Sequence, residues 1–324
     1  MKLFALTAAA LALAAGCAPA TSAELLQLEA KIPLGQVAGR IDHMAFDAAH
    51  RRLFVAELGN DSVGIVDVAA RKVIHRIAGL RNPQGVGYLP SLDLLFVANA
   101  TDGSVRLFGG TGYAEAGRLD LGEDADNIRI DAAVNRVLVG YGAGALAMID
   151  PASRRKVSDV PLAAHPESFQ HDPASNRIYV NLPDAKAIAM IDPTTHRATS
   201  WPMPAGGNFP MALRPASQHV IVVFRQPARL GVFAMADGAQ VAMPETCGDS
   251  DDVFDDAKRN RVYVSCGDGF LDVFDADGYR RIGHIPTVAG ARTSLFVPEI
   301  DRLFLAVRAN GREPAAIWVF RPSP

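Results

Sequence analysis

Short apolar runs recur along this chain at a nearly constant distance. The runs LFV, LFV, VLV, IYV, VIV, VYV and LFL directly follow Arg52, Leu94, Arg136, Arg177, His219, Arg261 and Arg302. These seven anchor positions lie 41 or 42 residues apart. A fixed period near 40 residues is typical of repeat proteins, in which each repeat is one supersecondary unit.

Each repeat holds four short segments with the composition of β-strands. In the third repeat they are NIRID, RVLVGY, ALAMID and KVSDVPL, separated by turn residues. An aspartate stands at the turn before many second segments and at the turn after many third segments, where its carboxylate can accept hydrogen bonds from backbone N–H groups. These turn aspartates are Asp47, Asp131, Asp172 and Asp256 in the first position, and Asp67, Asp150, Asp192 and Asp275 in the second. Seven units of four strands predict an all-β, seven-bladed β-propeller.

The seventh repeat lacks a fourth strand. After RLFLAV it has one further strand pattern, AIWVF (Ala316–Phe320), whereas ELLQLEAKIPL (Glu24–Leu34) has a strand pattern but no repeat of its own. We therefore expect the N-terminal segment to complete the last blade, which would close the ring and leave no open edge between blades. The propeller is predicted over residues 25–322.

The phrases RIYV, RVYV and RLFV resemble the YVTN-type repeats of YncE-like seven-bladed propeller proteins. The resemblance covers about residues 25–322. It implies an exported propeller, and no catalytic residue carries over from it.

The composition agrees with this fold and limits the partners. The chain is 49% hydrophobic, with 28 glycines and 21 prolines, which favours many short elements joined by turns. The net charge is −3 and there is no Lys/Arg block, so we expect no nucleic-acid partner. A monomer is expected.

The first residues have the pattern of an export signal. Lys2 precedes the apolar run Leu3–Ala15, which is shorter than the roughly 20 residues that span a bilayer. The motif AAGC resembles a bacterial lipobox, so we predict a signal peptide over residues 1–16, lipidation of Cys17 and a tether over residues 17–24. The alternative is an ordinary signal cut after Ala20 or Ala23. A lipid on Cys17 would anchor the protein without a membrane span, and the similarity to Gram-negative lipoproteins implies a periplasmic protein sorted to the outer membrane.

Two further cysteines remain, Cys247 and Cys266. In an oxidising compartment they can form a disulfide, and their spacing across one hairpin allows it. The alternative is two unrelated small residues.

One set of repeat positions is polar but different in every blade. Nine and ten residues before the anchors stand Asp42/His43, Gln84/Gly85, Asp126/Asn127, Glu167/Ser168, Phe209/Pro210, Asp251/Asp252 and Arg292/Thr293. Two residues further back stand Arg40, Asn82, Asp124, His165, Gly207, Asp249 and Gly290. In a propeller these positions meet at the mouth of the central channel, and we call them the channel-mouth ring. The alternative is a ring that is only solvated.

The ring suggests two kinds of ligand. Asp126, Glu167 and Asp251 offer the oxygen ligands that Ca²⁺ or Mg²⁺ prefers. Asp42, His43, Gln84, Asn127, Arg292 and Thr293 are candidate contacts for a small ligand. Arg292 can bind a carboxylate, and His43 or His165 can titrate near neutral pH.

No compact catalytic motif is present: the sequence has no Walker loop, HExxH, CxxC or GxSxG. We therefore expect a lipid-anchored binding protein of the cell envelope that presents the ring to a small ligand, a metal or an envelope protein. One alternative is a hydrolase or lactonase that uses a divalent metal at the channel mouth, an analogy with some propeller enzymes that rests on the fold alone. Another is a purely structural partner in the envelope.

Overall fold

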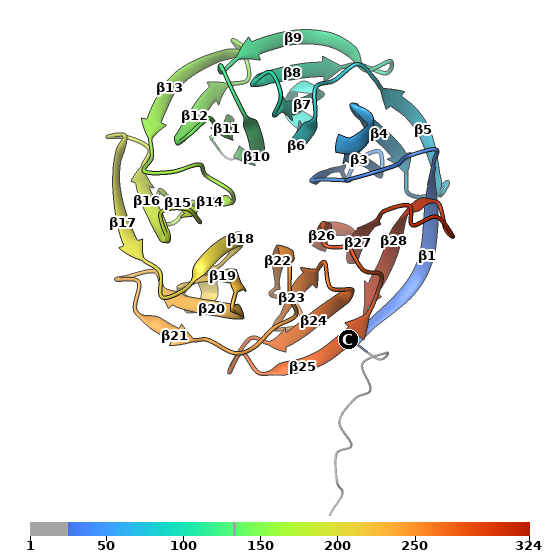
Figure 1. Ribbon diagram of the computed structural model, residues 1–324. Coiled ribbons are helices and arrows are strands. Elements are labelled where there is room, and N and C mark those ends of the chain that lie inside the picture. Colours follow the sequence, from blue (N-terminus) through green and yellow to red (C-terminus); the bar gives the residue numbers. More distant parts are fainter. Residues whose placement is uncertain (1–24, 132–133) are drawn as a thin grey trace, which may run out of the picture.

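The chain folds into a ring of seven blades around a central channel (Figure 1). The structure is a computed structural model that describes residues 25–131 and 134–324. Each blade is a four-stranded antiparallel sheet. The seven-bladed all-β prediction is confirmed.

The strands follow the repeat order, with the first strand of each blade innermost. Blades 1 and 2 contain β2 (Met44–Asp47), β3 (Arg52–Glu57), β4 (Ser62–Asp67), β5 (Lys72–Ile77), β6 (Pro83–Leu89), β7 (Leu94–Asn99), β8 (Ser104–Gly109) and β9 (Ala114–Asp120). Blades 3 and 4 contain β10 (Ala125–Asp131), β11 (Arg136–Tyr141), β12 (Ala145–Asp150), β13 (Arg155–Pro161), β14 (Phe169–Asp172), β15 (Arg177–Leu182), β16 (Ala187–Asp192) and β17 (Arg197–Pro202).

Blades 5 and 6 contain β18 (Gly206–Arg214), β19 (His219–Gln226), β20 (Ala228–Ala234), β21 (Gln240–Ala242), β22 (Ser250–Asp256), β23 (Arg261–Cys266), β24 (Phe270–Asp275) and β25 (Arg281–Pro286). Blade 7 contains β26 (Ser294–Val297), β27 (Arg302–Val307), β28 (Ala315–Pro322) and β1 (Leu26–Gly35). Short 3₁₀ turns occur at Leu58–Asn60, Pro90–Leu92, Pro215–Ser217 and Pro298–Ile300. All seven anchor positions are the first residues of second strands.

The N-terminal strand closes the ring as predicted. β1 pairs antiparallel with β28, from Leu26 opposite Pro322 to Gly35 opposite Ala315. Its side chains enter two cores: Leu26 packs between blades 6 and 7, and Ile32 packs between blades 7 and 1. The last blade is thus built from both ends of the propeller, which leaves no unpaired radial edge there.

Apolar cores lie between neighbouring blades. One such cluster lies at each of the seven blade interfaces and is built mainly from second and third strands, whose residues are almost fully buried. This explains why the apolar run after each anchor is the most regular feature of the sequence. None of the helices within the described ranges is long and apolar enough to cross a membrane.

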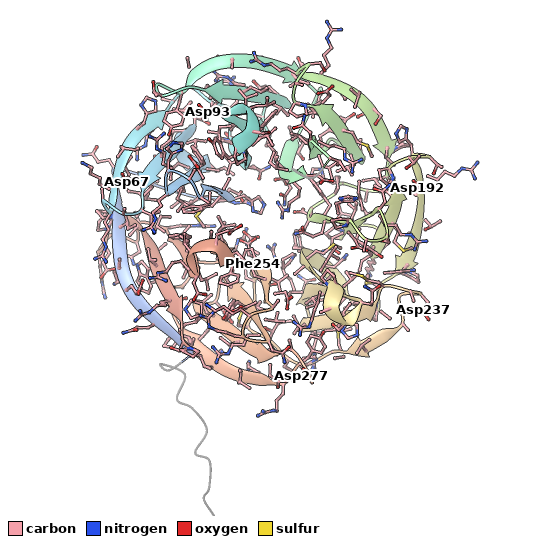
Figure 2. All side chains as sticks on the ribbon, turned by 180° about the vertical axis from the view of Figure 1, so that it is seen from behind. Asp67, Asp93, Asp192, Asp237, Phe254 and Asp277 are labelled. Carbon is pink, nitrogen blue, oxygen red and sulfur yellow. A yellow bond between two sulfur atoms is a disulfide. The ribbon has the colours of Figure 1, made fainter. Side chains whose placement is uncertain are left out.

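The predicted turn aspartates hold the corners of the blades. Asp47 accepts hydrogen bonds from the N–H groups of Ala49 and His50 at 3.0 and 3.2 Å, and Asp192 accepts one from Thr194 at 2.8 Å. Figure 2 shows Asp67 and Asp192 at the outer part of the disc, far from the channel, whereas Phe254 lies near its centre. These aspartates are structural.

Candidate functional site

The channel-mouth ring lies where the chain enters the innermost strand of each blade. Asp42 and His43 directly precede β2, and Asp126 and Asp251 are the second residues of β10 and β22. The inner strands approach closely, because a Cβ on Gly85 would lie 2.0 Å from the Asp126 carbonyl oxygen. Blades 2 and 3 can therefore meet at the mouth only with glycine at this position. The side chain of Gln84, beside it, forms no hydrogen bond with the part of the chain that the structure describes.

A cavity of about 300 Å³ occupies the channel beneath the mouth. Its lining comes from the innermost strands of six blades. His43, Arg129, Gln170 and Asp252 supply polar groups, and Phe254 is among the apolar residues. The volume is at the lower end of the range for small-molecule sites, and the mixture of apolar walls with a few polar groups is typical of them.

Asn127 organises the upper part of the cavity. Its amide nitrogen donates to the Glu167 carbonyl at 2.8 Å and lies 3.1 Å from His43 Nε2, while its amide oxygen accepts from Arg129. The amide nitrogen is thus the donor toward His43, which requires an unprotonated Nε2 on a neutral ring. Burial also favours the neutral ring, but the carboxylates of Asp42 and Asp252 outweigh it and raise the pKa of His43. Protonation of His43 at Nε2 would place its N–H opposite the N–H donor of Asn127, with no acceptor between them.

Asp251 is held by three neighbours from two other blades. Its Oδ1 accepts from Arg225 Nη2 at 2.6 Å, and its Oδ2 accepts from Thr293 Oγ1 at 3.0 Å and lies 3.3 Å from Arg292 Nε. Burial alone would raise the pKa of Asp251, but the surrounding cations keep it below its ordinary value. Arg225 also lies over the Phe209 ring, with its guanidinium carbon 3.7 Å from the ring centre. This cation–π contact accounts for the aromatic residue Phe209 in the channel-mouth ring.

Other acidic groups of the mouth are less well compensated. Burial raises the pKa of Asp42 to about 6, although Arg40 Nη2 lies 2.7 Å from its Oδ2. Burial and the neighbouring Asp126 raise the pKa of Glu167 to about 7. Asp252, deeper in the channel, has its pKa raised to about 7 by burial, although its Oδ2 accepts a hydrogen bond from the N–H of Ser294 at 2.7 Å. Perturbed carboxyl groups around a cavity are characteristic of functional sites.

His165 lies between a backbone carbonyl and two carboxylates, which favour its charged form. Its Nδ1 donates to the Gly142 carbonyl at 2.6 Å, and its Nε2 lies 3.5 Å from Asp126 Oδ2. Burial opposes the charge, but these partners raise the pKa of His165 to about 9. The expectation that His165 titrates near neutral pH is therefore corrected.

The three proposed metal ligands do not converge on one point. The acidic oxygens of Asp126, Glu167 and Asp251 do not converge within 4.8 Å of one another, and Asp251 uses both oxygens for cations and a hydroxyl. In residues 25–131 and 134–324, the ligand atoms of Cys247, Cys266 and Asp268 do come that close. That group offers no free thiolate, because its two sulfurs are bonded to each other.

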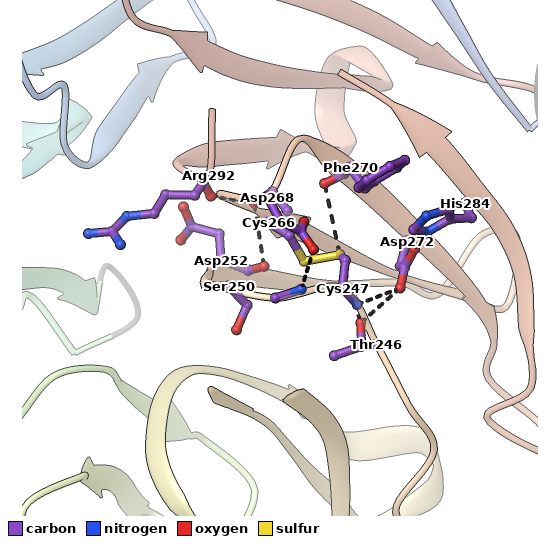
Figure 3. Close-up of a disulfide and its surroundings, with 12 residues drawn as sticks. Thr246, Cys247, Ser250, Asp252, Cys266, Asp268, Phe270, Asp272, His284 and Arg292 are labelled. Atoms are coloured by element: carbon purple, nitrogen blue, oxygen red, sulfur yellow. Dashed lines mark hydrogen bonds and ion pairs between the residues drawn. A yellow bond between two sulfur atoms is a disulfide. The ribbon is translucent and has the colours of Figure 1, made fainter. Parts of the chain in front are cut away.

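Cys247 and Cys266 form a disulfide with an S–S distance of 1.94 Å. It ties the connection between blades 5 and 6 to the end of β23 (Figure 3). The N–H of Cys247 donates to Asp272 Oδ2 at 2.8 Å. Figure 3 shows Arg292 and Asp252 extending away from this disulfide. It is a structural element beside the site.

Sequence reasoning missed three cations of the site. Arg129 is two residues after Asn127, and strand alternation places both on the same side, so this signal was available. Arg225 and Arg308 occupy one repeat position, six residues after the anchors His219 and Arg302, where the other repeats have Leu, Ala, Gly or Pro. Both lie at the mouth end of second strands.

Comparisons with known proteins show the fold alone. The chain matches no protein-family model, and no curated protein is similar to it. Among solved structures, 1734 chains are similar, so the architecture is common and points to no single activity. One is Kuenenia stuttgartiensis hydrazine synthase, with 16% identity and a TM-score of 0.76 over 89% of this chain and 98% of that chain. The chain is thus a seven-bladed β-propeller, and its YncE-like character stays a prediction.

Proposed function

We propose that this propeller is a binding protein whose site consists of the channel mouth and the cavity beneath it, and whose ligand is a small polar molecule. The observation that carries the proposal is the incomplete pairing of charged side chains around a cavity of about 300 Å³. Holding such groups away from water costs free energy, which a ligand that contacts them can offset.

The cavity and its incompletely paired charged groups are features of a binding site. The proposed metal ligands do not converge, and the Thr293 hydroxyl beside Asp251 is used in hydrogen bonds that join neighbouring blades. These observations favour a binding protein over a metal-dependent lactonase or hydrolase. An envelope protein that covers the mouth is the occupant to expect if no small molecule binds.

We also propose that the protein acts in the cell envelope, anchored by a lipid on Cys17. The signal peptide, Cys17 and the tether lie outside the described residues. The Cys247–Cys266 disulfide supports an oxidising compartment, because such bonds persist mainly in exported proteins.

A thermal unfolding screen against small polar metabolites tests the binding proposal. A ligand present at a hundred times its dissociation constant stabilises the folded state by about 2.7 kcal/mol, which is visible as a higher midpoint. The stabilisation should be lost in Arg129→Gln, which changes the channel, and kept in Arg197→Gln, which changes an exposed arginine on outer strand β17. Equal stabilisation of both variants would place the binding site elsewhere.

A further inference from the structure

The two sides of the channel mouth differ in the charged groups that they carry. One side, formed by blades 5, 6, 7 and 1, brings together Arg225, Asp249, Asp251, Arg292, Arg308, Arg40 and Asp42. The ion pairs there join Arg40 to Asp42, Arg225 to Asp251, and Arg292 to both Asp249 and Asp251. Four guanidinium groups thus face these three carboxyl groups, and Asp252 of blade 6 lies deeper in the channel. Arg308 takes part in none of these ion pairs. We call this the basic side.

Arg308 is the cation without a partner on this basic side. It forms no ion pair or hydrogen bond with any described residue, and it lies over the connection before β26, with its Cδ 4.0 Å from where a Cβ on Gly290 would be. The neighbouring cations Arg292 and Arg40 add to burial in lowering the pKa of Arg308. The N–H donors of the Arg308 guanidinium are thus unused on the basic side.

The opposite side, formed by blades 3 and 4, is acidic. Asp124 and Asp126 share His165, which lies 3.6 Å from Asp124 and 3.5 Å from Asp126. Arg225 lowers the pKa of Glu167 through its charge, without an ion pair or hydrogen bond between them. The Glu167 carboxylate makes no ion pair and no hydrogen bond with the residues that the structure describes. Its raised pKa reflects burial and the repulsion from Asp126. The acidic side thus has an unused acceptor.

These two unused groups belong to blades on opposite sides of the ring. Glu167 belongs to the connection before β14 and Arg308 follows β27, and in Figure 1 these strands lie on opposite sides of the ring. They do not pair with each other. A simple anion drawn to Arg308 would leave Glu167 uncompensated, and a simple cation drawn to Glu167 would leave Arg308 uncompensated.

We propose that the mouth binds a zwitterion, a small molecule with one carboxylate and one ammonium group. The carboxylate lies among Arg308, Arg40 and Arg292, where the guanidinium groups have free N–H donors. The ammonium lies beside Glu167 and Asp126. This inference rests on the proposed binding function and names the chemical class of its ligand.

Calorimetric titration of the full chain with matched probes tests the proposal. The zwitterions are β-alanine, γ-aminobutyrate, 6-aminohexanoate and a set of L-α-amino acids, which vary the separation of the two charges. For each, the matched carboxylic acid without the amine and the matched amine without the acid are measured too. We expect at least one zwitterion to bind roughly tenfold more tightly than both of its matched probes.

Two variants separate the two ends of the ligand. Glu167→Gln should remove the preference for the zwitterion over its matched acid while binding of the acid remains. Arg308→Met should weaken the zwitterion and the acid alike, and Arg197→Gln should change neither. Because Glu167 and Arg308 make no side-chain bonds with described residues, both variants should fold, which their thermal unfolding checks.

Two results would overturn the inference. One is a matched acid or amine that binds as tightly as every zwitterion. The other is that no zwitterion binds at concentrations of about 10 mM, because binding weaker than this would be too weak for a small-ligand site. Neither result decides the binding function itself. If the wider screen finds another compound whose stabilisation is lost in Arg129→Gln, the proposed function stands and only the ligand class is wrong.

Discussion

Thr293 donates a hydrogen bond to Asp251 at 3.0 Å, although the two residues are 42 positions apart. This separation is one repeat, so the contact joins corresponding turns of blades 6 and 7. Thr293 Oγ1 also lies 3.3 Å from the Ile41 carbonyl of blade 1. Thr293 was a candidate ligand contact, and its hydroxyl is used for holding three blades together.

The variant Thr293→Val should destabilise the protein. It keeps the shape of the side chain but leaves the buried Asp251 with one donor fewer, which costs about 1–3 kcal/mol. Urea unfolding measures the loss. Thr293→Ser retains the hydroxyl and is the control, and equal midpoints for the two variants would show that the hydrogen bond contributes nothing.

Glu167 should make stability depend on pH. A carboxyl group whose pKa is raised to about 7 on folding binds its proton more tightly in the folded state. The contribution of Glu167 to the free energy of unfolding is therefore fully present below its ordinary pKa near 4.5, and this contribution is lost as the pH rises through about 7. Glu167→Gln should thus stabilise the protein at pH 8, by about 1–2 kcal/mol after allowance for its partial exposure, and have little effect at pH 4.

Thermal unfolding of the Glu167→Gln variant at both pH values measures this difference. Glu299→Gln, at an exposed position beside β26, is the matched control. A stabilisation of Glu167→Gln that is the same at both pH values would mean that the carboxyl group is not desolvated.

The disulfide should contribute measurably to stability. It closes a loop with a sequence separation of 19 residues, for which loop-closure entropy predicts about 3 kcal/mol. The double variant Cys247→Ala with Cys266→Ala should unfold at correspondingly lower denaturant. Addition of dithiothreitol to the double variant should have no further effect, whereas an unchanged midpoint in the double variant would contradict the prediction.

The closing strand should be essential for cooperative folding. Removal of residues 24–34 would expose the edge of β28 and open two apolar clusters, so we expect no cooperative transition. Ile32→Ala is a milder test and should cost about 2–4 kcal/mol, because Ile32 is fully buried. Leu28→Ala on the same strand, where the side chain is 41% exposed, should cost much less. A deleted chain that unfolds like the full chain would refute the closure.

Cys17 should decide the attachment of the protein to the membrane. If it carries a lipid, the wild-type protein will fractionate with membranes and Cys17→Ser will not. Cys247→Ala provides a control that leaves the lipobox intact. Membrane association that persists in Cys17→Ser would reject lipidation and favour an ordinary signal peptide or a protein partner.

The repeat carried almost all the information about the fold. A period of 41 or 42 residues and an apolar run after each anchor located every second strand, because these runs fill the cores between blades. The segment Glu24–Leu34 was recognisable as the missing strand, since one blade lacked an outer partner. Architecture was therefore predictable from local pattern alone.

The site was predictable only as a set of positions. The repeat alignment placed Asp42, Asn127 and Asp251 at the mouth, but it could not show that Asp251 is already satisfied by Arg225 and Thr293. These pairings join residues of different blades, and side-chain geometry decides them. For this reason a set of carboxylates that resembled a metal site is instead a partly balanced network with guanidinium groups.

The pairing of Leu26 with Pro322 places the two ends of the propeller next to each other. The order of the blades around the ring would therefore stay the same whichever blade came first along the chain. A circularly permuted chain, with these ends joined and new ends opened in an exposed connection between two other blades, would need no new strand partner. The seam in blade 7 could in that way be moved around the disc while the channel and its charged mouth stay the same.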